Sequence, residues 1–310
     1  MKVLGLHLGL LALLAVLGMI LPAYHQGNLS RIMVLATYAV GYNVMFGYTG
    51  LLSLGHAMFF GAGMYGLGLA MQHGGVGAVP AFGIGLVSAA VLSAVVAVLA
   101  LRTIGVAFMI VTLMFSQAAF LSALYFGEWT RGDEGFVLAQ QIRRVGEVDL
   151  SNPVTRYYAA LLLFSVALLL TMRMTQVRFG HVLVAVRENE ERTRMLGYSV
   201  WSHKFWAVVI SGTISGAAGA AYALLFGYVG ASFVSVPYSI FPLLWVLLGG
   251  AGTTIGPFVG TLFMFYLIDY LSGLTTAYML VVGIVLVLLT LFARAGLMGE
   301  IRKRWVPWLP

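Results

Sequence analysis

"VPAFGIGLVSAAVLSAVVAVLAL", residues 79–101, runs for 23 consecutive positions without a charged side chain. About 20 predominantly apolar residues are enough for a helix to cross the hydrocarbon core of a bilayer. The rest of the chain has the same character, being 61% hydrophobic and only 9% charged, with a mean hydropathy of +0.98. An ordinary soluble domain carries about 25% charged residues. The sequence therefore predicts an all-α, polytopic transmembrane helical bundle.

Apolar runs of this kind recur along the whole chain, so residues 1–310 are predicted to form one transmembrane domain with about 8–10 spans. The first run carries Lys2 and could be a signal peptide, but its length and the lack of a small-residue cleavage site favour a retained span. The ten apolar segments are 3–22, 30–46, 53–72, 79–101, 104–127, 156–172, 205–229, 236–250, 254–271 and 275–293.

Basic residues indicate how these spans are oriented. If all ten segments cross, twelve Lys and Arg residues fall on one side of the membrane and five on the other. The richer side is expected to be cytoplasmic, which places both termini and residues 173–204 inside and residues 128–155 outside. This distribution accounts for the net charge of +7 without a nucleic-acid partner. The twelve are Lys2, Arg102, Arg173, Arg178, Arg187, Arg192, Arg194, Lys204, Arg294, Arg302, Lys303 and Arg304; the five are Arg31, Arg131, Arg143, Arg144 and Arg156.

The two long loops differ in pattern. Residues 128–155 combine Gly, Pro and charge, which indicates irregular structure. Within 173–204, the stretch "VRENEERTRMLGYSVWSHK" (186–204) holds seven of the 27 charged residues. A helix is predicted over 181–196, ending before Gly197, which suits a left-handed conformation. Three pairs stand four residues apart and can pair along that helix: Arg187/Glu191, Glu188/Arg192 and Glu190/Arg194.

Two glycine-rich segments interrupt the predicted spans, at 46–63 and 248–260. An unwound helix is tolerated at membrane depth only where it is buried in protein or lines water. The first segment is therefore a candidate translocation pathway, although close packing through small residues explains it equally well. A duplicated unit is conceivable, but the two segments share mostly glycine. The candidate pathway residues are Gly47, Tyr48, Thr49, Gly50, Ser53 and His56, with Gly55 as a further break; the late helix-breaking residues are Gly249, Gly250, Gly252, Gly256 and Pro257.

Catalytic and ion-coupled functions find little support. The chain has no GxxxxGK[ST], HExxH or GxSxG motif and no cysteine, so it is not predicted to be an enzyme. Inside the spans we find essentially two ionisable residues, His56 and Asp269, and Asp269 is predicted to be interfacial. No metal site is predicted, because His56 has no partner at ligand spacing and suits a bracing role better. A chain that moves solute uphill would then need ATP hydrolysis from another polypeptide, docked on 181–197. The alternative is an ordinary hydrated loop.

Three blocks, in order along the chain, resemble the permease subunits of branched-chain amino acid ABC importers, specifically the LivM type. They are "YNVMFGYTGLLSLGHAMFFGAGMYG" (42–66), "VRENEERTRMLGYSVWSHKFWAVVISGTISGAAGAAYA" (186–223) and "LLWVLLGGAGTTIGPFVGTLF" (243–263). "SLGHA" is typical of this subunit rather than of its usual heterodimer partner. "WTRGDEGF" (129–136) is similar to the family's outer pattern "TGG-x-DG", but Arg131 stands where the family more often has Gly.

The resemblance implies a permease in a bacterial or archaeal cytoplasmic membrane, carrying branched-chain or other aliphatic amino acids. It implies a second permease subunit, two cytoplasmic ATPase subunits that hold ATP and Mg²⁺, and an extracytoplasmic solute-binding protein. No cofactor is expected on this chain. The resemblance also implies that residues 173–204 are a cytoplasmic coupling loop, and the matching residues are Arg187, Glu188, Asn189, Glu190 and Gly197. Urea, short amides or sugars remain alternative cargoes; a passive channel for a small neutral solute and a structural scaffold remain alternative functions.

Overall fold

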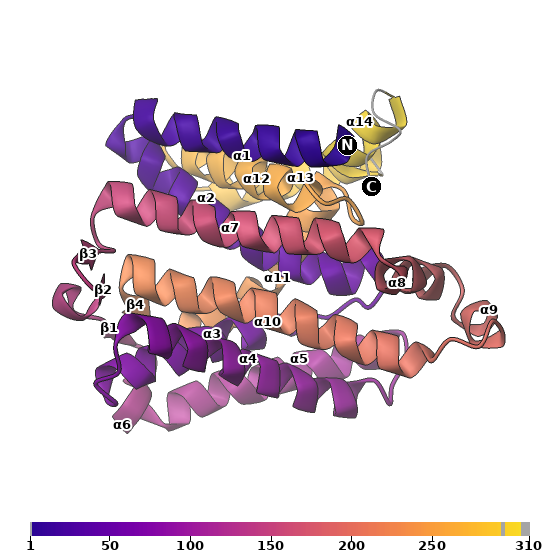
Figure 1. The fold of residues 1–310 in the computed structure, drawn as a ribbon, viewed down its shortest axis with the longest axis horizontal. Coiled ribbons are helices and arrows are strands. Elements are labelled where there is room, and N and C mark those ends of the chain that lie inside the picture. Colours follow the sequence, from indigo (N-terminus) through magenta and orange to yellow (C-terminus); the bar gives the residue numbers. More distant parts are fainter. Residues whose placement is uncertain (1, 293–294, 305–310) are drawn as a thin grey trace.

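The computed structural model describes residues 2–292 and 295–304 as a helical bundle whose long helices lie along the longest axis of the molecule (Figure 1). The helices are α1 (Lys2–Ile20), α2 (Ala23–Asn43), α3 (Ala57–Gln72), α4 (Ala78–Ala100), α5 (Val106–Tyr125), α6 (Gly127–Thr130), α7 (Pro153–Gln176), α8 (Arg178–Glu188), α9 (Glu190–Met195), α10 (Val200–Phe226), α11 (Val236–Gly249), α12 (Gly256–Ser272), α13 (Tyr278–Phe292) and α14 (Gly296–Arg304). A π-helical turn, η1 (Val44–Tyr48), extends α2, and two 3-10 turns are η2 (Gln140–Ile142) and η3 (Ala231–Val234). The strands are β1 (Phe136–Val137), β2 (Arg144–Val145), β3 (Val148–Asp149) and β4 (Tyr228–Val229).

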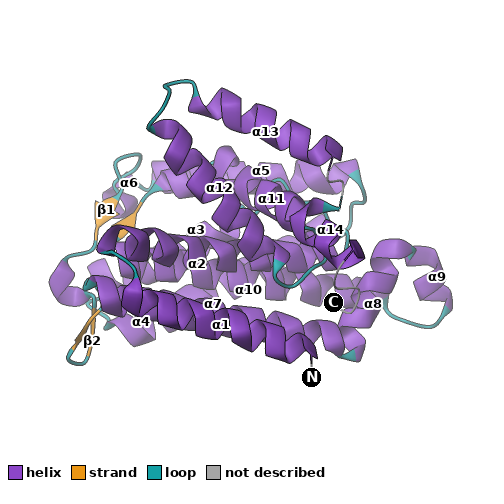
Figure 2. Ribbon diagram, turned by 90° about the horizontal axis from the view of Figure 1, so that it is seen from above, coloured by secondary structure: helices purple, strands orange, loops and turns teal. Residues whose placement is uncertain are grey.

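The predicted fold class is confirmed. Within the described residues, six helices are long and apolar enough to cross a membrane, namely α1, α2 with η1, α4, α5, α7 and α10. Shorter helices account for the other predicted segments: α3 has 16 residues, α11 has 14, α12 has 17 and α13 has 15. Each of the ten predicted segments thus contains one helix, and three of the four short ones, α3, α11 and α12, adjoin the glycine-rich breaks. Seen from above, α13 lies at the edge of the bundle (Figure 2).

Helices α3, α4 and α10 pack through glycine. A Cβ added at Gly63 would lie 1.9 Å from the carbonyl oxygen of Gly216, and one at Gly219 would lie 1.9 Å from that of Phe60. A Cβ at Gly216 would lie 2.1 Å from the Cβ of Ala89 on α4. No side chain fits at these points, so the three backbones approach as closely as small residues permit in membrane proteins.

One end of the bundle carries all four short strands and is called the strand end here (Figure 1). Residues 128–155 are more regular there than predicted. β1 pairs antiparallel with β4, with Phe136 opposite Val229, and β2 pairs with β3 across a turn at Gly146. The first pairing depends on a partner almost 100 positions away in the sequence, which local turn signals do not reveal.

The opposite end carries α8, α9, α14 and the beginning of α1, with α8 and α9 projecting beyond the bundle (Figure 1). We call it the α8–α9 end. The single helix predicted over 181–196 is wrong in one respect, because Asn189 is extended (φ −159°, ψ 105°) and separates α8 from α9. Among the predicted inner basic residues, Arg294 lies outside the described residues, as do the side chains of Lys2, Lys303 and Arg304.

Candidate functional site

The first glycine break begins where α2 changes into the π-helical turn η1. Residues 49–56 then run without helix until α3 starts. Gly50 adopts φ +77°, a left-handed conformation that favours glycine. A Cβ at Gly47 would lie 2.5 Å from the backbone nitrogen of Gly252, and one at Gly55 would lie 1.8 Å from the carbonyl oxygen of Thr112 on α5. Glycine is therefore required here for both backbone conformation and close approach.

The late break separates α11 from α12 and folds one back on the other. Gly250 and Gly252 have φ values of +116° and +75°. Pro257 then occupies the first turn of α12, where its missing N–H needs no helical partner. A Cβ at Gly249 would lie 1.8 Å from the carbonyl oxygen of Gly256, so both arms of this bend meet backbone to backbone.

The two breaks contact each other through Asn43, the last residue of α2. Its Nδ2 donates to the carbonyl oxygen of Thr253 at 2.9 Å, and its Oδ1 accepts from the backbone nitrogen of Gly252, also at 2.9 Å. Asn43 is fully buried. This residue is absent from the predicted site, although a lone amide inside an apolar run, one turn before "GYTG", is a recognisable signal of a buried polar contact.

His7 on α1 was also missed, and the prediction of two ionisable residues inside the spans is wrong in this respect. It lies within a candidate span, is fully buried, and its Nε2 lies 2.8 Å from Oγ1 of Thr254 in the late break. Its Nδ1 lies 2.7 Å from the carbonyl oxygen of Val3. His7 therefore makes local hydrogen bonds with both ring nitrogens, and it attaches α1 to the late break.

Arg187 brings the charged segment and both breaks together. Its side chain leaves the end of α8, and Nη1 donates a hydrogen bond to the carbonyl oxygen of Gly47. A Cβ at Gly50 would lie 2.8 Å from Cγ of Arg187, and one at Gly252 would lie 2.8 Å from its Nη1. Beneath it, Leu183 of α8 packs against Tyr48. Of the predicted coupling residues, Arg187 is the one whose side chain reaches the breaks.

The remaining coupling residues stabilise α9 or lie in the solvent-exposed part of the segment. Asn189 caps α9, its Oδ1 accepting from the backbone nitrogen of Arg192 at 2.9 Å, while Glu188 is exposed. Glu190 pairs with Arg194 at 3.4 Å, as predicted, and also with Lys204 of α10. The predicted pairs Arg187/Glu191 and Glu188/Arg192 straddle the extended residue 189, and neither forms an ion pair within the described residues. Gly197 has φ +86°, as predicted.

The C-terminal end of α9 and the residue after it expose apolar side chains that the charge pattern of the sequence does not indicate. Met195 is 84% exposed and Leu196 is 75% exposed. Arg192 and Arg194, on the same short helix, are also exposed. Adjacent exposed apolar side chains of this size are candidates for contact with another protein or with a membrane surface.

The candidate pathway residues lie in the first break or at the start of α3. Tyr48, Thr49, Ser53 and His56 are all buried within this chain. The Nε2 of His56 lies 2.7 Å from Oγ of Ser215 on α10. Its ring stacks on Tyr38 at 5.7 Å between centroids and meets Tyr42 and Phe59 edge-on. No group of three His, Cys, Asp or Glu side chains able to hold a metal ion occurs in the described ranges. His56 thus braces α3 against α2 and α10.

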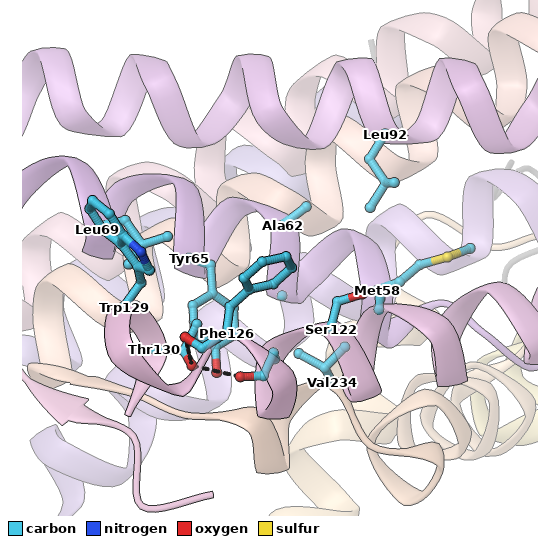
Figure 3. Close-up of a pocket in the computed structure, with 13 residues that line it drawn as sticks. Met58, Ala62, Tyr65, Leu69, Leu92, Ser122, Phe126, Trp129, Thr130 and Val234 are labelled. Atoms are coloured by element: carbon cyan, nitrogen blue, oxygen red, sulfur yellow. Dashed lines mark hydrogen bonds between the residues drawn. The ribbon is translucent and has the colours of Figure 1, made fainter. Parts of the chain in front are cut away.

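An apolar cavity of about 480 Å³ lies between α3, α4, α5, α6 and η3 (Figure 3). Its lining is largely apolar and includes Met58, Phe126 and Trp129. The hydroxyl of Tyr65 is buried there without a hydrogen-bond partner, while Oγ1 of Thr130 donates to the carbonyl oxygen of Ala123 (Figure 3). The volume falls within the range of small-ligand pockets, and its chemistry suits an aliphatic group.

Comparison with known proteins agrees with this arrangement of helices, glycine breaks and charged segment. Residues 26–291 match the family model described as branched-chain amino acid transport system / permease component. The chain belongs to this family. No solved structure matches it.

The curated relatives of this family member are LivM proteins, which confirms the predicted resemblance. The chain is 27% identical over 294 residues to the high-affinity branched-chain amino acid transport system permease protein LivM of Escherichia coli K12, covering 88% of this chain and 69% of the relative. The Salmonella typhimurium LivM is 28% identical over 295 residues with the same coverage. A probable LivM of Methanocaldococcus jannaschii is 34% identical over 91 residues, 29% of this chain and 26% of the relative.

Proposed function

We propose that this permease is a membrane subunit of an ATP-binding-cassette importer, carrying branched-chain or other aliphatic amino acids that an extracytoplasmic binding protein delivers. Family membership supports transport of this cargo class. The observation that carries the proposal is the contact of Arg187 with Gly47, next to Gly50 and Gly252. It connects a projecting charged segment directly to the two places where the helices are broken.

The proposed coupling follows from that geometry. When an ATPase displaces α8 and α9, Arg187 transmits the movement to residues 47–50 and, through Gly252, to the bend between α11 and α12. Backbone at a glycine break changes direction more easily than backbone inside a helix, because fewer helical hydrogen bonds must be broken. The displacement would therefore change the angle of α3 and α12 and alternate access to the substrate.

The proposed partners are a second permease subunit in a heterodimeric core, two ATPases that hold ATP and Mg²⁺, and the binding protein. The exposed Met195 and Leu196, with Arg192 and Arg194 beside them, support an ATPase contact at the α8–α9 end. The permease would lie in a bacterial or archaeal cytoplasmic membrane, with the α8–α9 end and both termini on the cytoplasmic side.

Ion-driven transport has less support from the spans. His56 and His7 contact Ser215 and Thr254, and Asp269 accepts a hydrogen bond of 2.6 Å from the Tyr24 hydroxyl near the end of α12. An ion-coupled transporter needs ionisable groups along its path, whereas these three are held in separate local contacts. Energy from a separate ATPase fits this chemistry better.

The direct test searches the neighbouring genes for a second permease, ATPases and a binding protein, and measures uptake by the transporter assembled from them in proteoliposomes. Labelled leucine should accumulate only when ATP is supplied on the ATPase side. Entry of leucine without ATP, only until the concentrations inside and outside are equal, would instead identify a passive channel. Competition by unlabelled valine but not by urea, acetamide or glucose checks the cargo class, and the opposite ranking would assign the alternative cargo.

A further inference from the structure

Three arginine side chains from separate segments converge on the last turn of α10, at the strand end. The Cζ atoms of Arg31 on α2 and Arg156 on α7 each lie 5.4 Å from the centroid of the Phe226 ring. Arg143, which immediately precedes β2, donates from Nη1 to the carbonyl oxygen of Leu225 at 3.3 Å. We call these three residues the arginine triad.

The charges of the triad are not balanced. Within the described residues, none of the three forms an ion pair with a carboxylate, and Arg156 is subject to repulsion from both Arg31 and Arg143. Asp149 attracts Arg143, but its carboxylate accepts hydrogen bonds from Ser151 and Gln140. The C-terminal end of α10 contributes only about half a negative elementary charge, against three positive ones.

The same place contains hydrogen-bond donors without acceptors. The Nε atoms of Arg143 and Arg156 are buried and unpartnered, as is Nδ2 of Asn28, one helical turn before Arg31. Buried donors are rarely left unpaired in folded proteins. Burial lowers the pKa of Arg143, because a desolvated cation is less stable than a hydrated one. The molecule therefore holds clustered cations and unused N–H groups.

A ligand can reach this cluster. Arg31 is exposed, so this chain leaves one side of the triad uncovered. Gly27, one turn before Arg31 on α2, lies next to Nη2 of Arg156, 3.8 Å from the position a Cβ would take. Glycine at position 27 therefore adds no side chain beside the Nη2 end of the Arg156 guanidinium, whose Nε atom is buried.

We propose that Arg31, Arg143 and Arg156 form a carboxylate-binding site at the strand end, between α2, α7 and α10. A carboxylate matches the guanidinium group in planarity and accepts two parallel N–H bonds, which makes such pairs strong and geometrically specific. The carboxylate comes either from a free amino acid or from an Asp or Glu side chain of a protein presented to this end. The inference concerns binding alone, so it does not rest on ATP-driven transport.

The test measures thermal unfolding of the purified full-length chain in nanodiscs of neutral phosphatidylcholine, followed by tryptophan fluorescence. A ligand that binds the folded state raises the unfolding midpoint by mass action. The first pair of probes is L-leucine and L-leucinamide at matched ionic strength and pH. The second pair is a capped triglutamate peptide and its triglutamine counterpart. The variants are Arg143→Gln, Arg156→Gln and, as the matched control, Arg144→Gln, the exposed neighbour of Arg143.

We expect one carboxylate probe to raise the midpoint while its amide counterpart does not. Arg143→Gln and Arg156→Gln should weaken that response about tenfold, and Arg144→Gln should leave it unchanged. Arg143→Lys keeps the charge but not the forked geometry of the guanidinium, so it should retain only part of the rise in the unfolding midpoint. Because this conservative variant is expected to fold, its partial response separates loss of binding from loss of folding. A leucine response assigns the site to free amino acids, and a triglutamate response assigns it to a protein. The proposal is overturned if neither carboxylate acts, or if the response survives in both glutamine variants. Since no ATPase or ATP is present, this outcome leaves the transport test unaffected.

Discussion

At the scale of single residues, Arg187 connects the charged segment to the first glycine break. Its backbone belongs to the segment that we propose to contact an ATPase, whereas its guanidinium binds the Gly47 carbonyl at the first break. Gly50 and Gly252 have no side chains to block the passage of this long side chain. The three glycines and the arginine are therefore one structural unit, although 205 positions separate Gly47 from Gly252.

Replacement of Arg187 by Gln should uncouple the transporter while leaving it assembled. A hydrogen bond to a charged group contributes about 1.5–3 kcal/mol, and we expect ATP-dependent leucine uptake to fall about tenfold or more. The exposed Arg178, at the other end of α8, is the matched control, and Arg178→Gln should transport normally. Uptake in proteoliposomes and ATPase co-purification are the two measurements. Normal uptake by Arg187→Gln would remove the proposed coupling contact.

Arg131, which departs from the family's sequence pattern, has an unusual backbone conformation in the structure. It has φ +58° and ends α6 in a left-handed conformation, the one non-glycine residue with positive φ among the described residues. This conformation costs an L-residue about 1–2 kcal/mol. At position 131 the branched-chain permease pattern more often has Gly, and the positive φ of Arg131 shows that the backbone conformation here also favours Gly.

At the scale of elements, the α8–α9 segment consists of two short helices attached in different ways. α8 buries Val182, Leu183 and Val186 against the bundle, whereas α9 is held by Glu190, which pairs with Lys204. The tip formed by the last residue of α9, Met195, and the following Leu196 is exposed. α8 therefore suits transmission of a movement into the bundle, and this tip suits contact with a partner.

Leu196→Asp should weaken ATPase binding by placing a charge in an apolar contact. Val177→Asp is its matched control, since Val177 is 50% exposed beside the start of α8 and lies away from the tip. We expect Leu196→Asp to reduce ATPase co-purification several-fold, while the yield and unfolding midpoint of the permease stay near those of the parent chain. Equal co-purification of both variants would show that the tip is not the docking surface.

The helices and their interruptions could be predicted from the sequence, whereas several contacts between them could not. Ten apolar runs and two glycine-rich breaks predict the helices and their interruptions, because span length and glycine content are local properties. The break at Asn189 was missed, since pairing at four-residue spacing continues through it in the sequence. The distant partners of Asn43 and His7 and the Gly47–Arg187 contact could not be predicted, because each contact joins segments far apart in the chain. The pairing of β1 with β4 was missed for the same reason.

For the molecule as a whole, orientation in the membrane decides whether the proposed coupling is possible. The beginning of α1, α8, α9 and α14 gather at one end, and the strands gather at the other (Figure 1). The excess of basic residues predicted for the first of these ends favours a cytoplasmic position. The strand end, with the arginine triad, would then meet solute from outside.

Single-cysteine labelling can establish this orientation, because the chain contains no cysteine. Met195 at the α8–α9 end is 84% exposed, and Val137 at the strand end is 69% exposed. With the permease expressed alone in intact cells, a membrane-impermeant maleimide should label Val137→Cys and not Met195→Cys. Both should react once the membrane is permeabilised. The reverse pattern would place the proposed ATPase contact on the wrong side.

The glycine contacts among α3, α4 and α10 limit how this molecule can deform. Where a carbonyl of one helix fits into the space left by a missing Cβ on its neighbour, axial sliding by even part of a turn would drive atoms into each other. The three helices must then travel together as a single rigid body. Hinge motion is then confined to the connections at its margins, residues 49–56, 101–105, 196–199 and 227–235, so stiffening these connections would restrain all three helices at once.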